Sequence, residues 1–525
     1  MAQTDRQTDR QTDRQTDRQT DRQTKFCLLV LFLLVILNLL RFPDFSSINY
    51  RNSDATWHTL LTVTAYDETP VSVHKFVPLV SLGEERDKYI PWGMTQPDDQ
   101  GNYYYTSFSP ALFVTAWAFF KLTGLPVGEE GLYCLSTLLL FMTCIAYWAV
   151  FRVCFGRKIQ YGLLSVLFLL MIFSPEVIHS TGLTYWAQSL MQILLPLQFI
   201  CYKKRDESCA FFCGFLFLCA LLPYVEWTGY VSDMGYLLVF LYSWKKRKEL
   251  ATRYWFRRVF VSGCIGFGIF CLHYLTVLTP YAFFRALALR FLARSTAASG
   301  SILDLCRSEW ISFWPLWLMA IGALLFLWRQ RIHLSSSMRV NLFLLGFPVL
   351  ENIVMKEHAI EYTYDHLKIA LPLMFFCYMV FSSVWSKEKL FRRGCAVLSI
   401  FLAIAGMLGY RAGSYYQWPC LYRASNEALA QEIQKKYPDS VMGLEKDGVR
   451  GYVNLLFRRG IYENIRDIHF LEEKAKSQGV DTIVLLKKQN EIQRGKHVDA
   501  WNMYHLKADI YHFDGEKVDW QRELQ

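Results

Sequence analysis

Residues 109–124 read SPALFVTAWAFFKLTG, and the place of this short apolar segment relative to the membrane decides the topology of the whole chain. A membrane-spanning helix needs about 20 consecutive apolar residues. A segment of this length therefore either spans the membrane or lies at its surface as an interfacial helix. The choice matters because it inverts every segment that follows.

Long apolar blocks make up most of the chain. Of its 525 residues, 53% are hydrophobic and only 19% are charged, whereas about a quarter are charged in a typical soluble protein. Blocks of about 18 or more apolar residues are typical of membrane spans. With residues 109–124 at the surface, we expect about eleven spans, at residues 26–40, 131–151, 159–178, 185–202, 209–227, 228–243, 259–279, 311–328, 340–355, 367–384 and 395–411.

The distribution of Lys and Arg decides between the two topologies, because cytoplasmic loops carry an excess of both. The short turns near 175–184 and 223–230 contain neither residue. If 109–124 spanned the membrane, every basic cluster would move outside, so the sequence predicts an interfacial helix there and a cytoplasmic N-terminus. The basic clusters then share one side of the membrane, at residues 152–158, 203–205, 245–258, 329–339 and 387–393.

The predicted fold class is an all-α polytopic membrane domain at residues 26–411, followed by a small α/β soluble domain. Residues 3–22 are five copies of Gln-Thr-Asp-Arg without an apolar residue, so we expect the segment 1–25 to be disordered. Residues 41–130 form a large outer loop. Residues 412–525 are expected to be extracytoplasmic, with a capped helix after Ser425 and a strand in DTIVLL at 481–486.

Composition also excludes several classes of partner. The net charge of +10 does not indicate nucleic acid, because the positive charge lies in short clusters between apolar blocks. The fourteen cysteines show no CxxC or CxxH spacing and lie mostly inside apolar blocks, which argues against a zinc framework or a disulfide scaffold. We expect no metal and no cofactor.

Ionisable residues at the outer ends of spans are costly there, so they are candidates for function. Asp54, in NSDATWHTLL at 52–61, follows the first span at the membrane surface, and the alternative is that it caps the helix that starts there. His58 is four residues later and shares the same helix face. Asp98 and Asp99 either hold a metal or form a turn, and we favour the turn.

Two basic segments are candidates for binding a phosphate. In KEHAIEYTYDH, at 356–366 between two predicted spans, Lys356 or His358 could hold a lipid phosphate, and the alternative is a solvated turn. In the loop 280–310, Arg285, Arg290 and Arg294 stand among Phe, Leu and Ala. This pattern indicates an interfacial amphipathic helix that faces anionic headgroups or only anchors the loop.

Together these segments resemble the GT-C glycosyltransferases that use polyprenyl-phosphate sugars, the protein mannosyltransferase and aminoarabinose transferase group in particular. The resemblance covers roughly residues 26–410. Gln188 stands where the family often has an acid, which leaves Gln188, Glu176 or His179 for that role. The matching stretches are NSDATWHTLL, DDQGNYYYTSFSPALFVTAWAFFKLTG at 98–124, RVCFGRK at 152–158 and FSPEVIHSTGLTYWAQSLMQ at 173–192.

The resemblance implies an inverting sugar transfer on the outer face of the membrane, from a polyprenyl-phosphate carrier to a lipid, glycan or protein acceptor. Asp54 would be the general base on the acceptor hydroxyl. Basic residues would stabilise the departing lipid phosphate. The implied substrate-binding residues are Lys356, His358, Arg285, His58, Gln188 and Glu176.

Two other functions stay open at this point. A transporter or flippase of lipid-linked glycans should show internal repeats and broken helices at mid-membrane, and neither stands out in the sequence. A catalytically inactive relative is favoured by Gln188 in the place of an acid. We expect a multi-pass protein of the cell membrane, and the lack of an Asn-x-Ser/Thr sequon favours the bacterial plasma membrane over the endoplasmic reticulum.

Overall fold

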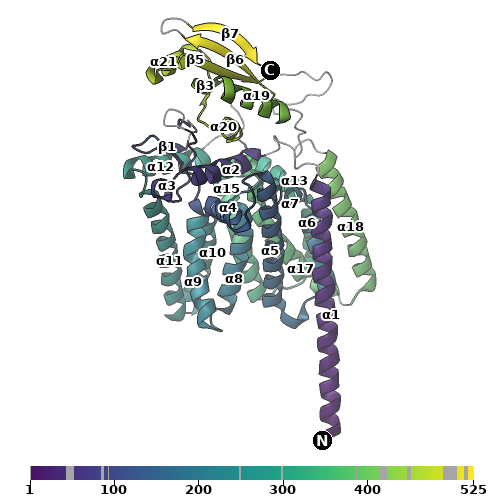
Figure 1. The fold of residues 1–525 in the computed structure, drawn as a ribbon. Coiled ribbons are helices and arrows are strands. Elements are labelled where there is room, and N and C mark those ends of the chain that lie inside the picture. Colours follow the sequence, from purple (N-terminus) through teal and green to yellow (C-terminus); the bar gives the residue numbers. More distant parts are fainter. Residues whose placement is uncertain are drawn as a thin grey trace.

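The computed structural model describes residues 2–42, 52–83, 88–90, 92, 94–247, 250–296, 300–385, 387–412, 423–445, 451–488, 505–513 and 518–524. Figure 1 shows the long helices side by side in one bundle, with a small α/β domain over one end. The N-terminal half of α1 (Ala2–Arg41) projects beyond the opposite end.

Seven helical segments of the described residues are long and apolar enough to cross a membrane. These segments coincide with apolar blocks that the sequence predicted to be spans. The chain is therefore a multi-pass membrane protein. The seven segments correspond to α1 (from Thr20 onward), α5 (Glu129–Phe155), α11 (Leu250–Tyr274), α13 (Ile302–Arg329), α14 (Ser336–Gly346) with α15 (Leu350–Val354), α17 (Ala370–Trp385) and α18 (Lys389–Ala412).

The four other predicted spans also coincide with helices: α6 (Tyr161–Ile172), α8 (Ala187–Lys204), α9 (Cys209–Val225) and α10 (Thr228–Arg247). Helices α6 and α9 are shorter, while α8 and α10 carry buried polar residues that lower their hydropathy. Gln198 on α8 donates a hydrogen bond to Asp233 on α10 at 2.7 Å, so these two side chains pair inside the bundle. The span count of about eleven stays a prediction.

The segment that decides the topology forms α4 (Pro110–Thr123). The Ser109 hydroxyl accepts a hydrogen bond from the Ala111 amide at 3.0 Å and caps the helix. Gly124 ends the helix at a φ of 69°, in the left-handed region where glycine is favoured. Helices α2 (Ser53–Glu68), α4 and α12 (Pro280–Thr296) lie at the end of the bundle next to the α/β domain (Figure 1).

Helix α1 differs from expectation, because it begins at Ala2 and continues through the Gln-Thr-Asp-Arg repeat that we expected to be disordered. The apolar part of α1 provides a helical nucleus, and adding residues to an existing helix costs much less than starting one. Asp21 and Lys25 also form an ion pair one turn apart, at 2.8 Å.

The C-terminal domain contains a five-stranded sheet in the order β4-β3-β5-β6-β7. Strand β3 (Ser440–Leu444) is parallel to β4 (Tyr462–Glu463) and β5 (Thr482–Lys488), and β6 (Leu506–Phe513) and β7 (Val518–Leu524) continue the sheet antiparallel. In the part of the domain that the structure describes, three helices accompany the sheet: α19 (Arg423–Lys436), α20 (Tyr452–Phe457) and α21 (His469–Gln478).

The α/β domain rests directly on α2. Tyr452 of α20 packs against Trp57 of α2, with 4.8 Å between the ring centroids. Two further contacts join the domain to other segments of the membrane domain: Trp92 donates to Glu463 at 3.3 Å, and Arg423 pairs with Glu129 of α5 at 2.6 Å. The domain therefore holds the helix that carries Asp54 and His58.

Candidate functional site

A cavity of about 130 Å³ lies at the end of the bundle that faces the α/β domain. Two other cavities within the bundle are about 20 Å³ each. The large cavity is formed by α2, the segments around the hairpin of β1 (Thr95–Pro97) and β2 (Tyr103–Tyr105), α12, and the region from α16 (Lys356–Glu361) to the 3-10 helix η5 (Thr363–Ile369). Its lining residues are Asp54, Ala55, His58, Trp92, Met94, Tyr105, Phe108, Trp186, Arg290, His358, Tyr362 and Tyr364.

Helix α2 brings Asp54 and His58 to the same cavity. Asn52 occupies the N-cap position of α2, so Asp54 lies inside the first turn and is not the cap. The positive end of the helix dipole stabilises a carboxylate at this position. The ring of His58 packs against that of Tyr105, with 4.2 Å between centroids.

Two hydrogen-bond donors in the cavity wall have no partner among the described residues: Arg290 Nε and Trp186 Nε1. A buried donor without an acceptor costs about 1–3 kcal/mol. A ligand with several acceptor oxygens, such as a phosphate, would remove this cost. The guanidinium would also supply the charge.

Arg285 lies elsewhere on the same helix. It is exposed, and its guanidinium lies over the ring of Tyr281 at 5.8 Å from the centroid. Arg290 follows five residues later, which at 3.6 residues per turn is about 140° around α12. The two arginines therefore face different sides, and the structure brings Arg290 to the cavity instead of Arg285.

Lys356 and Glu176 also lie outside the cavity wall. Lys356 lies near Asp304, whose carboxylate accepts hydrogen bonds from the Ser301 amide and hydroxyl at 2.7 and 2.8 Å. Glu176, on α7 (Pro175–Ser180), is fully buried and accepts hydrogen bonds from Ser180 and from Ser312, the latter at 3.2 Å. Neither side chain is among those that line the cavity.

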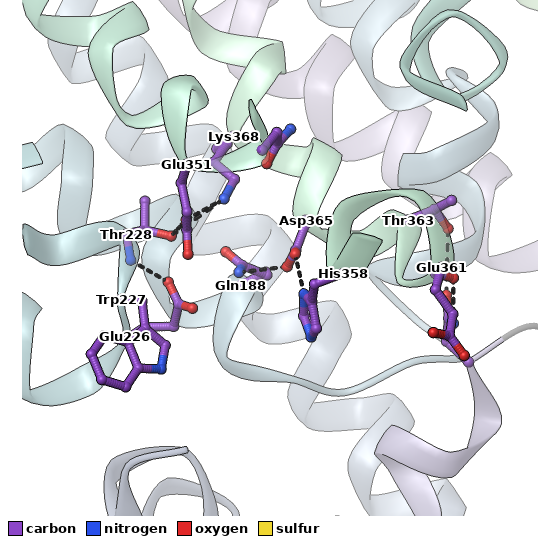
Figure 2. A network of polar contacts seen from close by, with 12 residues as sticks. Gln188, Glu226, Trp227, Thr228, Glu351, His358, Glu361, Thr363, Asp365 and Lys368 are labelled. Carbon is purple, nitrogen blue, oxygen red and sulfur yellow. Dashed lines mark hydrogen bonds and ion pairs between the residues drawn. The ribbon is translucent and has the colours of Figure 1, made fainter. Parts of the chain in front are cut away.

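Gln188 reaches the cavity only through two other residues. Its Nε2 donates to Asp365 Oδ1 at 2.8 Å, and Asp365 Oδ2 accepts from His358 Nδ1 at 2.5 Å (Figure 2). All three side chains are buried, and His358 lines the cavity. The sequence contained Asp365 in the polar stretch 356–366, but gave no signal for its pairing with Gln188.

A buried ion pair lies beside this chain of hydrogen bonds. Lys368 pairs with Glu351, Thr228 donates from its hydroxyl to the same carboxylate, and the Thr228 amide donates to Glu226 at 2.7 Å (Figure 2). Lys368 and Glu351 each fall inside a predicted apolar span. The only sign of this pair in the sequence was a single acidic residue, Glu351, in one predicted span and a single basic residue near the start of another, Lys368.

Asp98 forms the turn between β1 and β2. Its Oδ1 accepts from the amides of Gln100 and Asn102, at 2.8 and 2.9 Å. Within the described ranges, no group of three or more His, Cys, Asp or Glu is arranged to hold a metal ion. The hydrogen bonds that Asp98 accepts within its own turn favour the turn as the interpretation of this residue.

Comparison with known proteins decides the fold. No protein-family model and no curated protein sequence matches the chain. Among solved structures, the oligosaccharyltransferase AglB from Archaeoglobus fulgidus, in complex with an inhibitory peptide and a dolichol-phosphate, matches with a TM-score of 0.56. The chain has the GT-C fold. That match covers 88% of this chain and 69% of AglB at 11% identity.

For a second GT-C structure, the match extends over nearly the whole of the other protein. ArnT from Cupriavidus metallidurans, bound to undecaprenyl phosphate, matches with a TM-score of 0.54 and 13% identity. The match covers 88% of this chain and 92% of ArnT. The GT-C fold thus extends over most of the chain.

Proposed function

We propose that the chain transfers a sugar from a polyprenyl-phosphate carrier to an acceptor on the extracytoplasmic face of the membrane, in the cavity beside Asp54. One observation carries the proposal: a single cavity holds a carboxylate, Asp54, and a buried arginine donor without a partner, Arg290 Nε. Transfer from a sugar phosphate needs both, since a proton leaves the acceptor and charge builds on the phosphate.

Asp54 is the general base in this mechanism, and it takes the proton from the acceptor hydroxyl. Arg290 binds the donor phosphate, and the Trp186 indole donates a further hydrogen bond to it. On α12, the exposed residues Leu289 and Phe291 lie on either side of Arg290, each about 100° from it around the helix. They offer an apolar path for the isoprenoid chain beside the phosphate.

The similar structures support this substrate class. AglB is in complex with a dolichol-phosphate, and ArnT is bound to undecaprenyl phosphate. A transporter of lipid-linked glycans remains the second candidate, and a chain that binds the carrier without transferring its sugar is the third. Transfer of radiolabelled sugar by the purified chain distinguishes the enzyme from both.

Arg290→Gln should weaken binding of undecaprenyl phosphate by roughly 10- to 100-fold, because a hydrogen bond to a charged group contributes about 1.5–3 kcal/mol. Native mass spectrometry of the detergent-solubilised chain measures the bound fraction. Arg285→Gln is the matched control, since it removes the same charge from the exposed side of the same helix. Equal losses in both variants would refute a specific role for Arg290.

Gly451→Ala should lower sugar transfer by about 100-fold, because a displacement of about 1 Å at a reacting group can cost that much. Gly451 has a φ of 85°, and a Cβ there would lie 2.7 Å from the carbonyl carbon of Trp57, on the helix that carries Asp54. The change therefore pushes the α/β domain away from α2, and turnover assays measure the result.

Gly479→Ala is the control for Gly451→Ala. Gly479 has a φ of 65° in the same domain, but a Cβ there meets nothing within 4 Å. Both variants place an alanine at a positive φ. This costs about 1 kcal/mol in the left-handed conformation of Gly479 and more at Gly451, whose ψ of -38° lies outside that region, and only Gly451→Ala also disturbs α2. If the two variants differ in melting temperature but have the same turnover, the α/β domain does not position α2.

A further inference from the structure

His358 stands between the cavity and a buried carboxylate. One edge of its ring faces Asp365, as Figure 2 shows, and the same side chain lines the cavity that contains Asp54 and Arg290. The ring also packs on Tyr362, with 4.6 Å between centroids. The imidazole is therefore held in one orientation by contacts on more than one side.

The hydrogen bond to Asp365 assigns the two ring nitrogens. An ionised carboxylate can only accept, so Nδ1 carries a hydrogen and donates it to Oδ2. Nε2 is then the ring nitrogen that gains and loses a proton, and the His358 side chain lines the cavity. Gln188 Nε2 donates to the other oxygen, Oδ1, at 2.8 Å, and Lys368 interacts electrostatically with the same carboxylate. Both contacts stabilise the negative charge that orients His358.

The proposed sugar transfer leaves one charge without a partner. Asp54 takes the acceptor proton as the new C–O bond forms. The bond between the sugar carbon and the phosphate oxygen breaks, and its electron pair stays on that oxygen. The phosphodiester, with one negative charge, becomes a phosphomonoester with two. Arg290 can balance one of these charges, and a second cationic or acidic group is needed for the other.

We propose that His358, as an imidazolium, donates its Nε2 proton to the departing phosphate oxygen, with Asp365 and Gln188 as positioning residues. The inference rests on the proposed function. After transfer Asp54 holds one extra proton and His358 has lost one, so exchange with water restores both. The ordinary pKa of imidazole is about 6.5 and the second pKa of a phosphomonoester is about 6. Matched values favour proton transfer between the two.

This role also accounts for Gln188 in the place of an acid. A carboxylate at residue 188 would lie within hydrogen-bond distance of Asp365, and two carboxylates there would compete for one proton. Asp365 would then become a poor acceptor for Nδ1. The neutral amide of Gln188 donates to Asp365 and keeps it ionised. The amide of Gln188 thus supports the His358–Asp365 pair.

Other titratable groups lie in the cavity or on elements that pack against α16, and a pH experiment has to separate their effects. In the cavity these are Asp54, His58, Tyr105, Arg290, Tyr362 and Tyr364. On α13, α15 and η5, which also pack against α16, they are Asp304, Arg307, Glu309, Glu351, Asp365, His366 and Lys368. A comparison of His358 variants with the wild type isolates the contribution of the one imidazole.

The test is binding of undecaprenyl phosphate, the product-like carrier, to the full chain in detergent from about pH 6 to about pH 9, on either side of the imidazole pKa. Fluorescence of Trp92 and Trp186, which line the cavity, reports binding. Wild-type affinity should fall by roughly tenfold or more as His358 loses its proton, since a hydrogen bond to a charged group contributes about 1.5–3 kcal/mol.

Three variants decide the result. His358→Gln should bind more weakly at low pH and lose the pH dependence above about pH 7, where the phosphate itself no longer titrates appreciably. Asp365→Asn, nearly the same size, should move the midpoint to lower pH, because the imidazolium loses its carboxylate. Glu357→Gln, on the same helix but outside the cavity wall, should behave like the wild type.

The outcomes separate the two proposals. A His358→Gln variant with the wild-type pH dependence overturns the role of His358 and leaves the proposed function intact. A wild-type chain that binds no undecaprenyl phosphate at any pH overturns the proposed function instead. A gel-filtration profile and a melting temperature equal to those of the wild type show that a variant is folded. If His358→Gln does not fold, the shift of the midpoint in Asp365→Asn tests the role of His358 instead.

Discussion

Asp54→Asn should reduce sugar transfer by about a hundred- to ten-thousand-fold while the chain still inserts and folds. Asn keeps the size of the side chain and one acceptor oxygen, but it cannot take a proton. Asp54 lies in the first turn of α2 and lines the cavity, so a carboxylate is present where an acceptor hydroxyl would meet the donor. Turnover of a radiolabelled polyprenyl-phosphate sugar measures the loss.

The matched control is Asp67→Asn, near the other end of the same helix. Asp67 pairs with Lys121 at 2.8 Å and accepts from the Trp117 indole at 2.9 Å, and it does not line the cavity. This variant should keep turnover close to wild type. If Asp54→Asn retains roughly a third or more of wild-type turnover, Asp54 is not the base, because a general base contributes far more than that.

The sequence predicted the elements whose limits are set by local chemistry. Ser109 before a proline and Gly124 after an apolar run mark the two ends of α4, because cap residues act within one turn of a helix. The long spans were also predictable, since an apolar block of sufficient length has few other stable forms. The helical form of the N-terminal repeat was not predictable from its composition. It depends on the apolar helix that follows the repeat and that the repeat extends.

The candidate site was predicted in part. Asp54, His58 and His358 line one cavity, as a shared role requires, but Arg290 lines it in place of Arg285 and Lys356. Nothing local distinguishes two arginines on one amphipathic helix. Which of them faces the cavity depends on how α12 is rotated against its neighbours. That rotation is a property of tertiary packing.

The bonding of Gln188 was beyond the sequence for a similar reason. The residue pairs with Asp365 across 177 positions of chain. A single sequence contains no information on such a contact. Gln188 therefore looked like the loss of an acid, whereas the structure places an acid, Asp365, beside it on another element.

Lys368→Met should destabilise the chain by about 3–5 kcal/mol, because it leaves a buried carboxylate without its cation. The Lys368 side chain is fully buried and that of Glu351 is 5% exposed. Thr228 still donates to Glu351 in this variant, but a neutral hydroxyl offsets only part of the desolvation of a charge. Thermal unfolding in detergent measures the change.

The double variant Lys368→Met/Glu351→Leu separates the pair from its individual charges. Removing both charges eliminates the uncompensated carboxylate, so most of the lost stability should return, as it does when buried ion pairs are replaced by apolar residues of similar volume. The pair connects α15 to η5, the element that also carries Asp365. If the double variant is stable but binds undecaprenyl phosphate weakly, the ion pair positions the His358–Asp365 pair. If it is no more stable than Lys368→Met, the cation is not what compensates Glu351, and the hydrogen bond from Thr228 becomes the candidate.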